Sequence, residues 1–306
     1  MRTSFFLQRS LSALLFALAA SVLSVQAAPP KPDWEAVSKI LNRKGTLFGD
    51  VYKLTFPRTD LRVQLDGEEI RPPLAFTYWM AFAPVGDQVV VLGDLVLKQD
   101  EVNPVISALQ QGGIDVTAVH NHLLNEKPRL MFLHFWGRGD AVALATTLQK
   151  ALSQTDAVST IAPPAWDTSP GSFPVEEVEK ILGQKGKMYA GVFQVSVPRV
   201  TNPQVGGIEA VPAMGTATTL NFQPVGSQAF ATGDFVLLTV EVNPVVRALR
   251  AHGLLVTAIH NHMLGEQPPM TFLHFWGRGT PQELARGLRA ALDQMQAAPM
   301  SHGEVK

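Results

Sequence analysis

The sequence predicts an α+β protein of two tandem repeats, each a mostly antiparallel sheet packed with helices, the two related by a pseudo-two-fold axis. The main observation is a duplication: residues 93–139 and 233–279 align without a gap, and roughly 29 of these 47 positions are identical. Segments with alternating apolar residues, typical of strands, occur in the same order in both copies. Helix-like segments that end at glycine lie between them.

The chain of 306 residues is long enough for two domains with cores of their own. We expect repeat domains at residues 33–157 and 174–295. Residues 158–173 contain prolines and small polar residues, a composition that favours a linker. Residues 296–306 are predicted to form a frayed tail.

The first 27 residues have the pattern of a secretory signal peptide. Arg2 and Arg9 precede an apolar run over residues 11–25, which is followed by a small-x-small cleavage pattern. Since no second apolar stretch is long enough to span a membrane, the mature chain is expected to lack a transmembrane segment. We therefore predict a periplasmic or secreted protein that begins near Ala28.

Composition excludes several classes of site. The chain has no cysteine, which excludes disulfides, thiolate metal sites and an acylated cysteine. The formal net charge is −1, and loss of the two arginines of the signal peptide leaves −3. A nucleic-acid surface is not expected, because no basic region is present to attract phosphates.

Each copy is expected to begin with a helix and three strands. In the first copy, the helix covers residues 34–42, and the alternating segment VYKLTFPR at 51–58 predicts a strand that ends at a proline. Another strand precedes the Pro-Val-Gly turn at 84–86, and the next, at 89–97, carries a Gly-Asp pair in its middle. The corresponding segments of the second copy are 175–183, 192–199, 224–226 and 229–237.

The second part of each copy is predicted to be helix, strand, strand, helix. Glu-Val-Asn-Pro-Val starts a helix over 101–113, because proline is tolerated in the first turn and glycine can end the helix. Strands follow at 116–122 and up to 137, and an amphipathic helix covers 140–152. The corresponding segments of the second copy are 241–253, 256–262, up to 277, and 281–292. This gives about five strands and three helices per copy.

The strings GDLVL, EVNPV, VTAVHNHLLNE and FLHFWGRG, in this order, resemble the LppY/LpqO family, a domain of unknown function (DUF1259), here in two tandem copies. The resemblance covers essentially the whole mature chain. It implies a repeated, exported bacterial domain, some of whose members are lipoproteins. This chain departs from those members because it has no cysteine to acylate. The resemblance implies no established activity, so the chemistry is argued from the residues.

The candidate metal ligands lie in the strings HNH and FLH, which hold six of the chain's eight histidines. Side chains alternate along a strand, so the two histidines of each HNH point to one face. A glutamate four residues later and the histidine of FLH complete a donor set suited to a divalent metal, with zinc as the first candidate. The predicted ligands are His120, His122, Glu126 and His134 in the first copy and His260, His262, Glu266 and His274 in the second.

The register of the hairpin between HNH and FLHFW decides whether His134 joins the cluster. If His122 pairs with Leu130, His120 faces Phe132 and His134 shares the face of both histidines. If His122 pairs with Arg129, His134 points away. The sequence leaves both registers open, because a shift of one residue reverses every side chain.

Two other interpretations of these residues stay open: a metal-free site for a polar ligand, and a structural network of buried histidines. Arg138 and Arg278, between glycines before a helix, are candidates for binding an anion. Glu101 and Glu241 have the pattern of helix-start residues, and they become ligand-binding candidates if they face the histidines.

The sequence thus favours an exported, duplicated protein that binds a divalent metal or a small polar ligand through the cluster of each copy. Metal-dependent hydrolysis is one chemistry open to it, with Glu126 as general base. Whether it is an enzyme stays open, since no nucleophile motif is present. The alternatives are a non-catalytic module that binds an envelope glycan or anion, and a structural or interaction protein. Its partner would be a small polar ligand or a component of the cell envelope.

Overall fold

A computed structural model describes residues 31–157 and 172–296. The predicted signal peptide, most of the predicted linker and the tail from residue 297 lie outside the described residues. Phe173, which the sequence places in the linker, is buried against the core of the second repeat. None of the helices in the described residues is long and apolar enough to cross a membrane.

The first repeat forms a six-stranded antiparallel sheet in the order β1-β2-β5-β6-β8-β7, accompanied by helices and a small two-stranded arm, β3-β4. Its elements are α1 (Trp34–Ile40), β1 (Thr46–Phe48), β2 (Val51–Pro57), β3 (Val63–Leu65), β4 (Glu68–Ile70), α2 (Pro72–Ala75), β5 (Thr77–Val85), β6 (Gln88–Lys98), α3 (Val102–Gln111), β7 (Asp115–His120), β8 (Leu130–Gly139) and α4 (Ala141–Leu152).

The second repeat forms an equivalent sheet, β15-β16-β14-β13-β10-β9, with its own arm, β11-β12. Its elements are α5 (Val175–Leu182), β9 (Gly186–Tyr189), β10 (Val192–Val197), β11 (Gln204–Val205), β12 (Ile208–Glu209), the 3-10 helix η1 (Pro212–Met214), β13 (Thr218–Val225), β14 (Gln228–Leu238), α6 (Thr239–Ala251), β15 (Leu255–His260), β16 (Met270–Gly279) and α7 (Pro281–Leu292). The predicted α+β class with two tandem repeats is confirmed.

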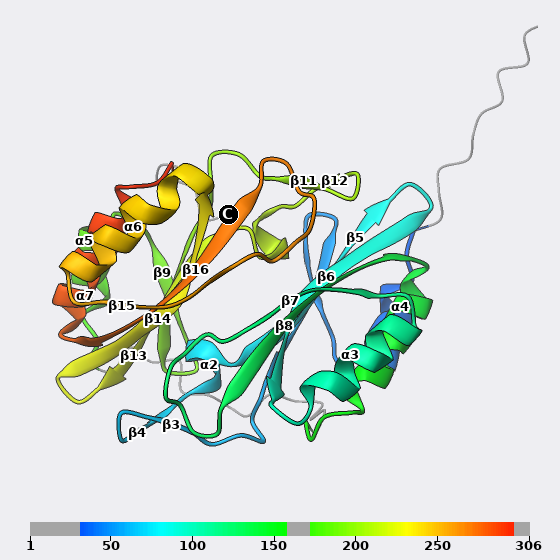
Figure 1. Ribbon diagram of the computed structural model, residues 1–306, viewed down its shortest axis with the longest axis horizontal. Helices are drawn as coiled ribbons and strands as arrows, with labels where there is room; N and C mark the ends of the chain where they lie inside the picture. Colours follow the sequence, from blue (N-terminus) through cyan, green and yellow to red (C-terminus); the bar gives the residue numbers. More distant parts are fainter. Residues whose placement is uncertain (1–30, 158–171, 297–306) are drawn as a thin grey trace, which may run out of the picture. The chain divides into compact units, whose positions relative to one another are not determined.

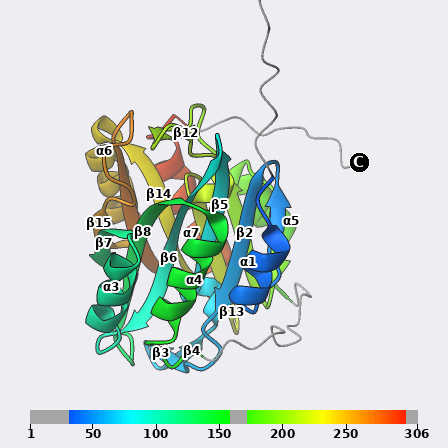
Figure 2. The same cartoon turned by 90° about the vertical axis from the view of Figure 1, so that its right-hand side faces the viewer.

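Each sheet buries one face under its own helices. Figure 2 shows α1, α3 and α4 on the outer face of the first sheet. Leu133, Phe135 and Gly137 lie on the same face of β8, because side chains alternate along a strand. A Cβ placed on Gly137 would meet Ile114 and Leu144 of the core at 3.1 Å, so Leu133 and Phe135 point to this side. The alternate residues of β8, including His134, therefore point to the opposite face, toward the second repeat.

The two repeats belong to one compact unit and hold each other reciprocally. Thr117 Oγ1 donates to the carbonyl of His262 at 2.5 Å, and Thr257 Oγ1 donates to the carbonyl of His122 at 2.6 Å. Asn121, the middle residue of the first HNH, donates to the carbonyl of Thr257, and its counterpart in the second copy donates to Thr117. Equivalent residues thus exchange equivalent contacts, as a pseudo-two-fold arrangement requires.

The strings in which the copies diverge form the two arms, which cross to the other repeat (Figure 1). Asp66, in the β3-β4 turn, accepts a hydrogen bond from Trp276 Nε1 at 3.2 Å. In the β11-β12 turn, Gly206 lies against the ring of Trp136. Each sheet has six strands rather than the expected five, because the short edge strands β1 and β9 form between the first helix and the first expected strand of each repeat.

Candidate metal centre

The hairpin adopts the register in which His134 joins the other histidines. His120 lies opposite Phe132, and Ala118 lies opposite His134. A bulge at Thr117 shifts the pairing between Val116 and Ala118, and the second repeat repeats the irregularity at the equivalent position. A bulge re-aims the side chain that it displaces, and here the displaced threonine contacts the other repeat.

The six histidines form one cluster rather than one cluster per repeat. The rings of His120 and His260 stack with centroids 3.5 Å apart. The ring of His122 lies 3.9 Å from that of His274, and the reciprocal pair of His134 and His262 lies at 3.8 Å. Every one of these close pairs joins the two repeats. The sequence predicted the residues, but not that the two sets merge.

Two aspartates complete the cluster. Asp94 Oδ2 lies 3.4 Å from His122 Nε2, and Asp234 Oδ2 lies 3.2 Å from His262 Nε2. Each belongs to the Gly-Asp pair of a central strand, and the glycine is required, because a Cβ on Gly93 would lie 2.3 Å from the carbonyl oxygen of Trp79. The signal that could have identified them is a charged residue in the middle of an apolar strand in both copies.

Most of the cluster is buried. His120, His134 and His274 are buried, and Asp94 is only 5% exposed. Phe132 stacks under His122 at 3.3 Å, and Phe272 lies under His262 at 3.4 Å. The low polarity of these walls strengthens any electrostatic interaction inside.

Backbone carbonyls fix the orientation of five of the rings. The Nδ1 atoms of the five lie 2.8 to 3.1 Å from a backbone oxygen, and a carbonyl can only accept, so Nδ1 must donate. In a neutral ring the other nitrogen, Nε2, then carries a lone pair and no hydrogen. The pairs are His120 with Asn121, His122 with Ala75, His134 with Gly93, His260 with Asn261, and His274 with Gly233.

All six Nε2 atoms are buried without a hydrogen-bond partner, as are one oxygen each of Asp94 and Asp234. Buried polar atoms in native proteins nearly always have a partner. In the five rings whose Nδ1 donates to a carbonyl, Nε2 offers a lone pair that lacks a donor, and a cation is a partner that suits such lone pairs.

The ionisation of the cluster agrees with neutral rings. Burial, and then the charges of neighbouring histidines, hold the pKa of His122 and His134 well below the usual range. Burial lowers the pKa of His274 to about 3. Burial, followed by the charge of Asp234, raises the pKa of Asp94 well above its ordinary value.

Three overlapping groups within the described residues bring their ligand atoms within 4.8 Å of one another. They are Asp234 with His260, His262 and His274; His120 with His122 and His274; and His120 with His134 and His260. Any two groups share a histidine. They therefore describe alternative ligand sets of one centre rather than separate sites.

The structure does not bring Glu126 or Glu266 into the cluster. Glu126 Oε1 accepts from the amide of Leu130 at 3.1 Å, and Glu266 Oε1 accepts from that of Met270 at 3.0 Å. Both carboxylates thus bind across the loop that joins HNH to the FLH strand. Asp94 and Asp234 occupy the place near the histidines that the sequence assigned to the glutamates.

Glu101 and Glu241 lie in buried ion pairs away from the histidines. Glu101 binds Arg58 at 3.0 Å and accepts from the amides of Lys98 and Asp156 at 2.7 and 2.9 Å. Glu241 makes the equivalent contacts with Arg199 and two amides. Their oxygens are engaged by protein donors, as expected of structural residues.

Arg138 and Arg278 are exposed and donate to the side chains of Gln88 and Gln228 at 2.8 and 3.0 Å. The helices after them are capped by their own side chains, since Asp140 accepts from Ala143 N at 2.9 Å. The structure places neither arginine at the cluster, and anion binding there stays a prediction.

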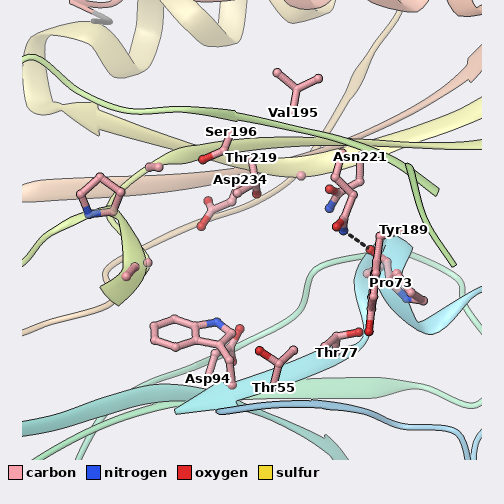
Figure 3. A pocket seen from close by; sticks show the side chains of 18 of the residues that line it. Thr55, Pro73, Thr77, Asp94, Tyr189, Val195, Ser196, Thr219, Asn221 and Asp234 are labelled. Atoms are coloured by element: carbon pink, nitrogen blue, oxygen red, sulfur yellow. Dashed lines mark hydrogen bonds between the residues drawn. The ribbon is translucent and has the colours of Figure 1, made fainter. Parts of the chain in front are cut away.

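A cavity of about 1000 Å³ adjoins the cluster, with walls from both sheets. Figure 3 shows Asp94 and Asp234 approaching it from opposite sheets. His122, His262 and His274 also line it. The centre can therefore be reached by a small molecule that enters the cavity.

Two segments of the chain, residues 35–154 and 176–294, match the family model described as Domain of Unknown Function (DUF1259). The chain belongs to this family. The resemblance predicted from its motifs is confirmed, including the two tandem copies, and the metal-ligating candidates fall within both DUF1259 segments. Comparison with curated protein sequences gives no significant match.

Two solved structures show a distant likeness to this DUF1259 chain. A trimeric bacterial microcompartment shell protein, PduB, matches with 12% identity and a TM-score of 0.22, covering 83% of this chain and 95% of that chain. EtuB from Clostridium kluyveri matches with 15% identity and a TM-score of 0.20, covering 81% and 90%. Similarity at this level supports no conclusion about fold or function.

Proposed function

We propose that the protein binds a divalent transition metal, zinc being the first candidate, at one centre shared by the two DUF1259 repeats. The observation that carries the proposal is the set of six buried Nε2 atoms without hydrogen-bond partners. Five of these rings are held by backbone carbonyls in the tautomer that exposes the Nε2 lone pair. Metal-ligating histidines in proteins are oriented in this way by a hydrogen bond from their other nitrogen.

The cost of burying unpaired polar atoms supports the same proposal. An unpaired buried polar group costs about 1 to 3 kcal/mol, and this cluster contains several. A bound cation would satisfy the histidine lone pairs and would also favour the charged form of Asp94. Ligand atoms around one zinc lie about 2.0 to 2.2 Å from it, so groups whose ligand atoms all lie within 4.8 Å of one another can converge on one ion after a contraction of the cluster.

The chemistry best suited to this centre is hydrolysis of a small molecule in the adjoining cavity. A metal with histidine ligands lowers the pKa of bound water toward 7. An aspartate that is not needed as a ligand could accept the proton of that water, in the role that the sequence assigned to Glu126. Asp94 and Asp234 both line the cavity and both lie beside the histidines.

The test is metal analysis of protein purified without an affinity tag. We expect bound divalent metal in the wild-type protein, and loss of most of it in the double variant His120→Ala/His122→Ala, which disrupts the two ligand sets that contain His120. The double variant His260→Ala/His262→Ala should lose most of the metal too, because it disrupts the set formed within the second repeat and one of the two sets that join the repeats. Independent sites would instead lose half in each variant.

The matched control is His252→Ala, which removes an exposed histidine outside the cluster. Its metal content should equal that of the wild type, and thermal unfolding should show that all variants fold. Wild-type metal content in both double variants would mean that the histidines form a structural network.

We further propose that the mature protein acts outside the cytoplasm, on the support of the charged and apolar pattern of its first 27 residues. Mass spectrometry of the protein from a periplasmic fraction should find an N-terminus near Ala28. Retention of the leader would contradict this.

A further inference from the structure

The cavity beside the metal centre contains two lysines that lack an anionic partner. Lys53 on β2 and Lys187 on β9 both line it. Lys53 Nζ lies over the ring of Trp79, 4.5 Å from the centroid. Neither lysine forms an ion pair within the described residues, whereas the surface residues Lys98 and Lys185 bind carboxylates at 2.6 and 2.7 Å.

The two ammonium groups are close enough to repel each other. Burial first, and then the positive charge of Lys187, lower the pKa of Lys53 to about 8. Lys53 is therefore still mostly protonated at pH 7. Two like charges in a partly enclosed space produce a positive potential that an anion would neutralise.

The lysines occupy positions where the repeats differ. Gln194 stands at the position of Lys53 in the second repeat, and its side chain donates to the carbonyl of Pro73 at 3.0 Å. Asn221, opposite Gln194 on the neighbouring strand, donates to the carbonyl of Leu74 at 3.1 Å. The side chains of Gln194 and Asn221 thus hold α2. Lys53 makes no such hydrogen bond within the described residues, and its ammonium group over Trp79 can still bind an anion. The cavity is thus asymmetric although the histidine cluster is symmetric.

The remaining lining fits an organic molecule rather than a bare ion. Phe48, Trp79 and Tyr189 provide apolar surface, and Thr55 and Ser196 provide hydroxyls. Figure 3 shows Thr55, Ser196 and Tyr189 around the same space as the aspartates. A cavity of about 1000 Å³ is at the upper end of the range that holds small-molecule ligands.

We propose that this cavity binds an organic oxyanion, a phosphate ester or a carboxylate, with its anionic group at Lys53 and Lys187 and its apolar part along Trp79. Lysine binds both groups as a point charge. The cavity reaches Asp94 and Asp234, so the far end of such a molecule lies at the centre. The role of this molecule as substrate rests on the proposed metal function, whereas binding of the anion does not.

The test is calorimetric titration at pH 7 with phenyl phosphate, benzoate and phenol. We expect at least one of the two anions to bind and phenol not to bind, and the tighter anion identifies the head group. Lys53→Gln, which copies the residue of the second repeat, should raise the Kd at least tenfold, and so should Lys187→Met. The matched control Lys185→Met, which changes an exposed lysine paired with Glu179, should leave the Kd unchanged.

Titration of chelator-treated protein separates this proposal from the metal proposal. Anion binding that survives metal removal, and that is lost in the lysine variants while their metal content stays at the wild-type value, supports the lysine site by itself. The proposal is overturned if neither anion binds more tightly than phenol. It is also overturned if both lysine variants retain the wild-type Kd while their thermal unfolding shows that they are folded.

Discussion

At the scale of the residue, Asp94 shows best how the site departs from ordinary core packing. It lies in the middle of an apolar strand, 5% exposed, beside a glycine that the adjacent strand requires. Burying a lone carboxylate costs several kcal/mol, and burial raises its pKa accordingly. Such a residue is expected to lower the stability of the metal-free protein and to be useful only when a cation is present.

The substitution Asp94→Asn separates these two effects. We expect the metal-free protein to unfold at the same temperature or higher, because a costly buried carboxylate is removed. Metal affinity, measured by competition with a chromophoric chelator, should fall at least about tenfold, since an oxygen at the centre loses its charge. Asp50→Asn, at an exposed acid outside the cluster, should change neither quantity. A destabilised variant with wild-type metal affinity would instead make Asp94 a structural residue.

At the scale of the element, the two arms show what the divergence of the copies accomplishes. The β3-β4 and β11-β12 arms have different sequences, yet each covers the tryptophan of the opposite repeat. Alternation along VYKLTFPR was enough to predict a strand, because burial of one face fixes that period. The partner of an arm could not be predicted, since the contact depends on a residue more than a hundred positions away.

The β11-β12 turn provides a direct test of this contact, because it contains two glycines with positive φ. A Cβ on Gly206 (φ +57°) would lie 2.6 Å from the ring of Trp136, whereas a Cβ on Gly207 (φ +85°) would meet nothing within 4 Å. Both alanine variants carry the backbone cost of about 1 to 2 kcal/mol. Gly206→Ala should lose a further ~1 to 3 kcal/mol from overpacking, measured by urea unfolding. Equal losses would show that the arm does not rest on the tryptophan.

At the scale of the whole molecule, the sequence predicted the ingredients of the site but not how they assemble. The duplication, the fold class and the histidines followed from periodicity and spacing. The sequence placed one site in each repeat, because no local pattern reports that His120 stacks on His260. It also placed Glu126 in the site, because the glutamate follows HNH at a ligand-like spacing, whereas a loop amide binds it instead.

The shared centre predicts that neither repeat alone binds metal as tightly as the full chain. Residues 31–157 and 172–296 can be expressed as separate chains. Each chain then lacks the histidines of the other repeat, and its own arm and its own tryptophan lose the contacts that cover them. We expect each to be poorly soluble or partly unfolded and to bind metal weakly. Co-expression should restore a one-to-one complex with wild-type metal content, because the reciprocal hydrogen bonds of Thr117 and Thr257 need no covalent link. Full-length protein cleaved at a protease site inserted between the repeats is the control, and it should stay associated and keep its metal. A single repeat that folds and binds metal as tightly as the full chain would show that the sites are independent and that their meeting in the structure has no functional role.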